Sequence, residues 1–260
     1  MQAHFSILLI EHIGIDSLVK KTIISPESYT ITQLSDSTKA WNFLLSNQYT
    51  DLIIVNINLP NKKGFQVSFE DILGKIKTHP NWKDIPTLII AHQDTDKSYL
   101  ENKIIPYANR ILLEPYNPLR FLDEIHQLTA DSVERHINSL NTQHTQLGVQ
   151  FNKILDLLSK APQDQTIIRA KFHYLAHVIN EHFLFEETYM DAHHYPDYQQ
   201  HRGEHNILRD ELAKLTEGKT PINLSSIKKL FSQVFGDINN DAVYIEFIEK
   251  LKDNLTARSR

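Results

Sequence analysis

The chain has 260 residues, which is long enough for about two domains of the usual size. Charged residues of both signs leave a formal net charge of −5, so the composition gives no electrostatic support for binding nucleic acid. The absence of cysteine excludes disulfides, thiolate metal sites and cysteine nucleophiles and fits a reducing compartment; any metal must be held by nitrogen and oxygen.

The beginning of the chain carries one short apolar stretch, Ile7 to Ile10. It is too short for the apolar core of a signal peptide or for a membrane span, and His4, Glu11 and His12 flank it. We therefore expect a cytoplasmic protein that neither crosses a membrane nor binds nucleic acid.

Residues 1–128 alternate short β-branched or apolar runs with helical segments. Strands that alternate with helices pair in parallel and bury both faces of their sheet. The pattern predicts an α/β, flavodoxin-like domain with a five-stranded parallel sheet. The predicted strands are Ser6–Ile10, Tyr29–Thr32, Leu52–Val55, Thr87–Ile90 and Arg110–Leu113.

Residues 129–260 lack strand patterns, and their apolar residues recur at spacings of three and four. Turn signals occur at Ala161-Pro162, at Tyr195-Pro196 and from Gly218 to Pro221. Four antiparallel helices with short loops are the simplest packing, so we predict an all-α, up-down four-helix bundle. The segment from Asp123 to Ser139 contains neither proline nor glycine and is predicted to run between the domains as one helix.

One motif in the first domain is specific. The run Asp51-Leu-Ile-Ile-Val-Asn56-Ile-Asn-Leu-Pro60, followed by Gly64-Phe65, resembles the third strand and following loop of a response-regulator receiver domain. In that family, an aspartate at the end of this strand accepts a phosphoryl group. Two acidic residues after the first strand help to hold magnesium, and a hydroxyl residue on the fourth strand and a lysine after the fifth complete the site.

Every one of these chemical positions is altered here. The acceptor position holds Asn56, whose neutral amide can neither attack a phosphoryl group nor bind magnesium as a carboxylate does. The acidic pair becomes Glu11 and His12, Ala91 takes the place of the hydroxyl residue, and Glu114 reverses the charge of the lysine. We therefore predict a pseudo-receiver used for docking or dimerisation. The alternative is an unrelated flavodoxin-like domain whose loop matches by chance.

Histidine is concentrated in the second domain, where nine of the fourteen histidines fall within residues 136–205. Four residues advance a helix by about 400°, so His182 and Glu186 project from one face about 6 Å apart along the axis. His201 and His205 repeat this spacing on the next predicted helix. Antiparallel packing would bring a carboxylate and three imidazoles together, as a metal centre requires.

Further motifs follow one another along the predicted helices of the second domain. Gln143-His144-x-x-Leu places a histidine on the apolar side of the first helix, and His182-Phe-x-x-Glu-Glu-x-x-Met, Tyr195-Pro196 and the His201/His205 pair follow in turn. In this order and spacing they resemble a bacterial hemerythrin over roughly Asn141 to Leu251. The alternative is a helical bundle without metal, in which these histidines are structural.

The resemblance implies two non-heme irons, bridged by a glutamate, an aspartate and an oxo or hydroxo oxygen, with an open position that binds O2. The aspartate falls on Asp241, because Asp241-Ala-Val-Tyr-Ile-Glu-Phe reproduces the family's aspartate followed by aromatics at three and six residues. The positions that match the family's metal ligands are His144, His182, Glu186, His201, His205 and Asp241.

One expected histidine ligand is missing just before Asp241. If the family's spacing of five residues between this histidine and the aspartate is kept, the histidine aligns with Gly236. If the family's His-Ile pair is matched instead, Asp237-Ile238 replaces it and one residue is deleted before Asp241. If Asp237 binds the metal, a hard anionic oxygen replaces an imidazole and favours ferric iron or manganese. If Gly236 occupies the position of the missing histidine, water or a vacancy replaces that ligand.

The fusion of the two domains favours a signalling or adaptor protein that senses O2, redox state or iron and carries its output through the pseudo-receiver. We expect an unidentified signalling protein as partner, or a homodimer formed through the receiver domain. One alternative is an enzyme that activates oxygen or peroxide, although the sequence gives it less support, because the Glu-x-x-His pairs of ferritin-like catalytic sites are absent. The other is a metal-free interaction scaffold.

Overall fold

The structure is a computed structural model that describes residues 5–11, 20–21, 23–24, 29–35, 37–46, 49–57, 69–80, 82–160 and 164–258. The chain divides into two compact units. The first unit is Met1–Arg135 together with Lys250–Arg260, and the second unit is His136–Glu249. The domain boundary predicted after residue 128 falls inside helix α5 (Pro118–Ser159) and remains a prediction.

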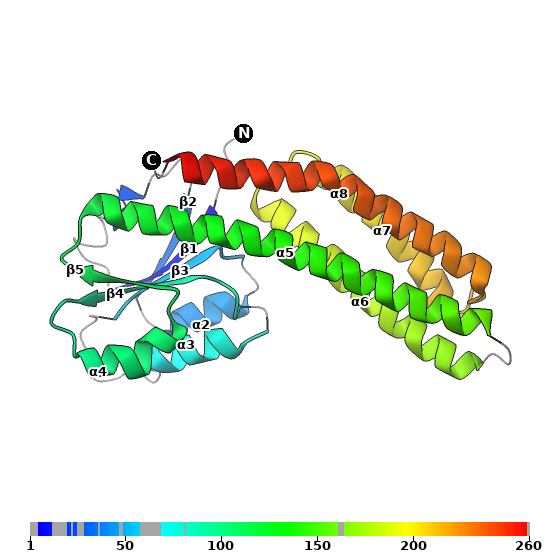
Figure 1. Cartoon of the computed structure of the whole chain (residues 1–260), viewed down its shortest axis with the longest axis horizontal. Coiled ribbons are helices and arrows are strands. Elements are labelled where there is room, and N and C mark those ends of the chain that lie inside the picture. Colours follow the sequence, from blue (N-terminus) through cyan, green and yellow to red (C-terminus); the bar gives the residue numbers. More distant parts are fainter. Residues whose placement is uncertain are drawn as a thin grey trace. The chain divides into compact units, whose positions relative to one another are not determined.

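The first unit is built on a five-stranded parallel sheet with the order β2-β1-β3-β4-β5 (Figure 1). The predicted sheet is confirmed, and each strand runs one or two residues further than the sequence pattern indicated. Its apolar, mostly β-branched residues are buried on both faces, as in a sheet covered on both sides. The strands are β1 (Phe5–Ile10), β2 (Tyr29–Leu34), β3 (Leu52–Asn56), β4 (Thr87–His92) and β5 (Arg110–Glu114).

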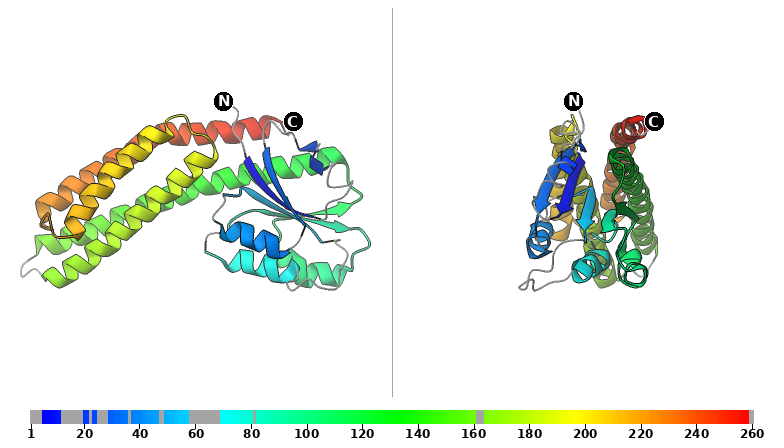
Figure 2. Two further views of the ribbon diagram at one scale, coloured as in Figure 1. Left: turned by 180° about the vertical axis from the view of Figure 1, so that it is seen from behind. Right: turned by 90° about the vertical axis from the view of Figure 1, so that its left-hand side faces the viewer.

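Helices cover the two faces of this sheet (Figures 1 and 2). Helices α2 (Ser37–Leu45) and α3 (Phe69–Thr78) lie on one face, where Leu44, Ile72 and Ile76 join the core with alternate strand residues. The beginning of α5 lies on the opposite face. Short α4 (Lys97–Tyr99), η1 (Leu100–Ile104) and η2 (Ile105–Tyr107) connect β4 to β5.

Helix α5 is continuous through Asp123–Ser139, as expected from the absence of proline and glycine. It is followed by three further helices in the described part of the chain. Asp164 caps the helix that follows α5, because its side chain accepts hydrogen bonds from the backbone of Thr166 and Ile167. Gly218, at φ +77°, follows the next helix. The three helices are α6 (Gln165–Ala192), α7 (Tyr198–Thr216) and α8 (Leu224–Arg258).

The second unit has one apolar core to which all four helices contribute. Representative members are Phe151 of α5, Phe172 of α6, Leu212 of α7 and Leu230 of α8, each at most 1% exposed. These residues recur at three- and four-residue spacings, so each helix turns one apolar face inward. Of the predicted turns, Ala161-Pro162 lies outside the described residues. Within the described part of the chain, no helix combines the length and apolarity that crossing a membrane requires.

Candidate metal centre

Polar side chains from all four helices converge beside this apolar core. Six of them are buried, and the side chain of His144 is only 14% exposed. The pairs on α6, α7 and α8 are each four residues apart, which places both members on the inner face of their helix. The converging residues are His144 of α5, His182 and Glu186 of α6, His201 and His205 of α7, and Asp237 and Asp241 of α8.

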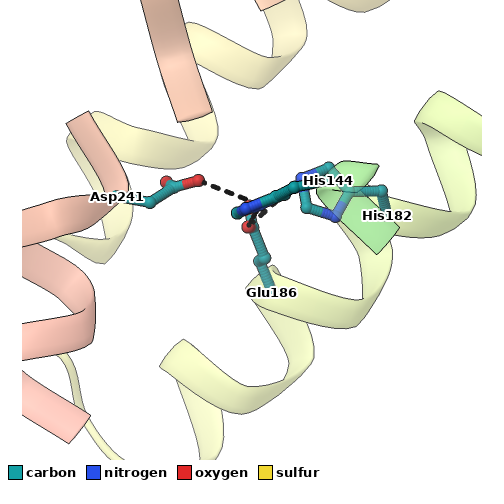
Figure 3. Close-up of side chains that lie close together, drawn as sticks. All are labelled: His144, His182, Glu186 and Asp241. Atoms are coloured by element: carbon teal, nitrogen blue, oxygen red, sulfur yellow. Dashed lines mark ion pairs between the residues drawn. The ribbon is translucent and has the colours of Figure 1, made fainter. Parts of the chain in front are cut away.

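One half of the cluster combines two histidines with one oxygen from each of two carboxylates (Figure 3). Glu186 Oε1 lies 3.3 Å from His182 Nε2 and 3.7 Å from His144 Nε2. Asp241 Oδ2 lies 3.5 Å from His144 Nε2. These four residues offer ligand atoms that all lie within 4.8 Å of one another, close enough to share one ion.

The other half uses the second oxygen of each carboxylate. Glu186 Oε2 lies 3.4 Å from His205 Nε2 and 3.5 Å from His201 Nε2. Asp241 Oδ1 lies 3.6 Å from His201 Nε2, and Asp237 Oδ2 lies 3.3 Å from His205 Nε2. Glu186 and Asp241 therefore each present one oxygen to one histidine pair and the second oxygen to the other pair.

Several of the converging atoms have no hydrogen-bond partner among the residues that the structure describes. Buried polar atoms are nearly always paired, because leaving one unpaired costs about 1–3 kcal/mol. So many unpaired atoms in one place fit a site that metal ions complete. The atoms are His144 Nε2, His182 Nε2, His205 Nε2, Glu186 Oε1, Asp237 Oδ2 and both carboxylate oxygens of Asp241.

The electrostatics of the cluster also favour a cation. Burial raises the pKa of Asp241 to about 10, and the negative charges of Glu186 and Asp237 add to this effect. Burial lowers the pKa of His205, but Asp237 and Glu186 outweigh it and raise that pKa to about 11. Burial lowers the pKa of His182 to about 4. Without metal, protons thus balance the buried carboxylates, and bound metal ions would displace them.

Glu186 ionises despite being buried. Burial works to raise its pKa, but contacts with His144, His201 and His205 hold the pKa well below the usual glutamate value. A carboxylate at the centre of the cluster is therefore charged, as a metal ligand must be.

Other side chains fix the orientation of the imidazoles. His182 Nδ1 lies 3.0 Å from Gln143 Oε1, and His205 Nδ1 lies 2.8 Å from Glu187 Oε1, which leaves Nε2 of each ring facing the cluster. Arg209 Nη1 donates a 2.8 Å hydrogen bond to the same Glu187 oxygen. Such partners set the tautomer and raise the basicity of a metal-binding histidine.

These orienting residues were not predicted from the sequence, although two of them adjoin predicted ligands in the Gln143-His144 and Glu186-Glu187 pairs. Glu204, which offers an oxygen within 4.8 Å of ligand atoms of His201 and Asp237, was not predicted either. Its position three residues after His201 on the same helix was the available signal.

The two residues considered for the missing histidine differ in their surroundings. Asp237 is buried, 6% exposed, and its carboxylate joins the cluster at His205. Gly236 has no side chain, and a Cβ atom added there would meet no atom within 4 Å. Asp237 is thus the residue that α8 brings to the cluster at this position.

The altered receiver positions lie at the carboxyl ends of the strands in the first unit. Asn56 Nδ2 donates a 2.9 Å hydrogen bond to Glu11 Oε1, and Ala91 is fully buried in β4. Lys20 Nζ forms an ion pair with Glu11 and another, at 3.2 Å, with Glu114 Oε1. Lys20 was not predicted to take part. His12 lies outside the described residues.

Comparison with known proteins finds similarity to response regulators. No family model matches it. The chain is 27% identical over 134 residues to the response regulator GtcR of Aneurinibacillus migulanus, an alignment that covers 49% of this chain and 50% of GtcR. The chain therefore spans about half the length of this curated relative.

Similar solved structures are receiver domains as well. One belongs to a signal transduction histidine kinase of Syntrophus aciditrophicus, with 19% identity, a TM-score of 0.42, and coverage of 49% of this chain and 91% of that chain. Another belongs to an HD domain-containing protein of Pseudomonas fluorescens, with 20% identity, a TM-score of 0.44, and coverage of 52% and 93%. Each of these similarities covers about half of the chain.

Proposed function

We propose that helices α5 to α8 form a hemerythrin-type, up-down four-helix bundle that holds two iron ions. The observation that carries the proposal is the pair of carboxylates, Glu186 and Asp241, each of which faces both histidine pairs. His144 and His182 would hold one ion, and His201 and His205 the other. Bound iron would supply redox chemistry and a position for O2.

Asp237 would be a further ligand of the second ion. Its carboxylate lies 3.3 Å from His205 Nε2. Three carboxylates and four histidines form a harder, more negative donor set than the family's, which favours ferric iron or manganese. The two ions would therefore be unequal, because only the second has a carboxylate of its own.

The whole chain would act as a signalling adaptor that senses O2, redox state or iron. The receiver domain supports signalling. Its acceptor position holds an amide, Asn56, so phosphorylation would not provide its input. The metal centre would provide the input instead, and the receiver domain would dock a signalling partner or dimerise.

Metal analysis tests this proposal directly. After anaerobic incubation with ferrous salt and removal of free ions, we expect about two irons per chain and a higher unfolding temperature by circular dichroism. Manganese is expected to bind as well. A chain that retains neither metal, and whose unfolding temperature is the same with and without chelator, would reject the metal centre and favour the interaction scaffold.

The orienting residue Glu187 provides a graded test. Replacing Glu187 with glutamine removes the charge that faces His205 Nδ1 and Arg209, and we expect iron affinity to fall about 10–100-fold. The matched control is Glu181→Gln, an exposed glutamate on the same helix, which should leave the affinity unchanged. Equal affinities of the two variants in a competition titration with a chelator would contradict the assigned role.

A second candidate function is activation of oxygen or peroxide. The observation that favours it is the carboxylate of Asp237 where the family has an imidazole, since anionic ligands stabilise oxidised metal. Steady-state assays of the iron-loaded chain with hydrogen peroxide and a reducing substrate distinguish this enzyme function from the sensor function. Catalytic turnover would favour the enzyme, and its absence in a fully loaded chain would favour the sensor.

A further inference from the structure

The carboxyl ends of three strands in the first unit bring together a charged cluster unrelated to the helical metal centre. Glu11 follows β1, Asn56 ends β3 and Glu114 ends β5. Lys20, nine residues after Glu11 in the chain, places its ammonium group among them. We call Glu11, Lys20, Asn56 and Glu114 the Lys20 cluster.

The ions of this cluster are unusually well shielded from water. The side chains of Lys20 and Glu11 are only 4% and 5% exposed, whereas that of Glu114 is 26% exposed. Removing an ammonium group and a carboxylate from water costs several kcal/mol for each ion unless they are paired. The ammonium group of Lys20 contacts both carboxylates, so it serves as their shared counter-charge.

One carboxylate oxygen of Glu11 is buried and unpaired among the described residues. Glu11 Oε1 contacts Lys20 and accepts the hydrogen bond from Asn56, while Glu11 Oε2 is buried without a hydrogen-bond partner among the described residues. Two carboxylates at the end of a parallel sheet are hard oxygen donors of the type that magnesium and manganese prefer. The cluster thus has the donors of a divalent-cation site and an ammonium group between them.

We propose that Lys20 is the built-in cation of this cluster. Its ammonium group takes the position that a divalent ion would otherwise occupy between Glu11 and Glu114, and it holds the ends of β1 and β5 together without any ion from solution. The first unit is therefore independent of magnesium, and removal of the Lys20 charge creates a divalent-cation site. This inference does not depend on the metal centre of the helices.

The full-length chain allows a selective test, because both of its tryptophans, Trp41 and Trp82, lie in the first unit. Tryptophan fluorescence during thermal unfolding therefore follows that unit alone. We expect Lys20→Met to lower the unfolding temperature by about 10 °C, because Glu11 loses its counter-charge. Millimolar magnesium should restore most of this loss in the variant and should leave the unmodified chain unchanged.

Three further variants sharpen the result. Lys21→Met removes the neighbouring positive charge and should remain insensitive to magnesium. The double variant Glu11→Gln with Lys20→Met should lose the magnesium response of the single variant, and Lys20→Arg should stay insensitive because it keeps the charge. Two results would overturn the proposal. One is a rise in the unfolding temperature of the unmodified chain with magnesium. The other is a Lys20→Met chain that magnesium does not stabilise, whether that chain is folded or unfolded without the ion.

Discussion

Replacing Glu186 with alanine is expected to reduce the iron content from about two ions per chain to near zero. The reason is geometric. Glu186 Oε1 lies 3.3 Å from His182 Nε2, and Oε2 lies 3.4 Å from His205 Nε2, so one residue contributes to both proposed ion positions. Iron content per chain, measured by plasma emission spectrometry after desalting, checks the prediction.

The control for this experiment lies on the same helix. Glu181 is five residues earlier, exposed and outside the cluster, so Glu181→Ala should keep both ions. Circular dichroism of both variants establishes that the helices remain folded. A folded Glu186→Ala chain that still binds two irons would show that Glu186 does not bridge them.

Replacing Asp237 with alanine should remove the second ion and spare the first. Asp237 lies 3.3 Å from His205 Nε2 and does not belong to the group of ligand atoms formed by His144, His182, Glu186 and Asp241, so its loss leaves the donors of the first position intact. We expect the affinity for the second ion to fall by at least about 100-fold, more than the loss of an orienting residue causes. Stepwise titration with iron and a competing chelator separates the two affinities.

Gly236→Ala is the matched control for Asp237→Ala, because the two residues are the alternatives for the missing histidine. A Cβ atom at position 236 would meet no atom within 4 Å, so both ions should remain bound. Alanine inside a helix should also stabilise the fold by about 0.5–1 kcal/mol relative to glycine. The opposite pattern, with the second ion lost in Gly236→Ala and kept in Asp237→Ala, would favour a water-filled or vacant slot at Gly236.

The sheet and the long helices were predictable from local patterns. Short apolar runs such as Leu52–Val55 need burial on both faces, and a parallel sheet provides it. The four-residue spacing of His182 with Glu186, and of His201 with His205, fixed which side chains share a helical face. Convergence of these four side chains was therefore predictable, Asp241 was assigned through the family resemblance, and metal binding by them remains a prediction.

The residues that were missed act across long distances in the chain. Lys20 contacts Glu114, which is 94 positions away, and the surrounding sequence gives no sign of that contact. Glu187 was visible beside Glu186, but its partner His205 lies on another helix. The choice between Gly236 and Asp237 also exceeded sequence reasoning, because a shift of one residue rotates a side chain by about 100° around the helix.

The most direct measurement is an anomalous diffraction map of the iron-loaded crystal at the iron absorption edge. The proposed centre predicts two peaks in the second unit, one beside His144 and His182 and one beside His201, His205 and Asp237, with Glu186 and Asp241 between them. A single peak, or iron bound away from Glu186 in a fully loaded crystal, would contradict a centre of two bridged ions.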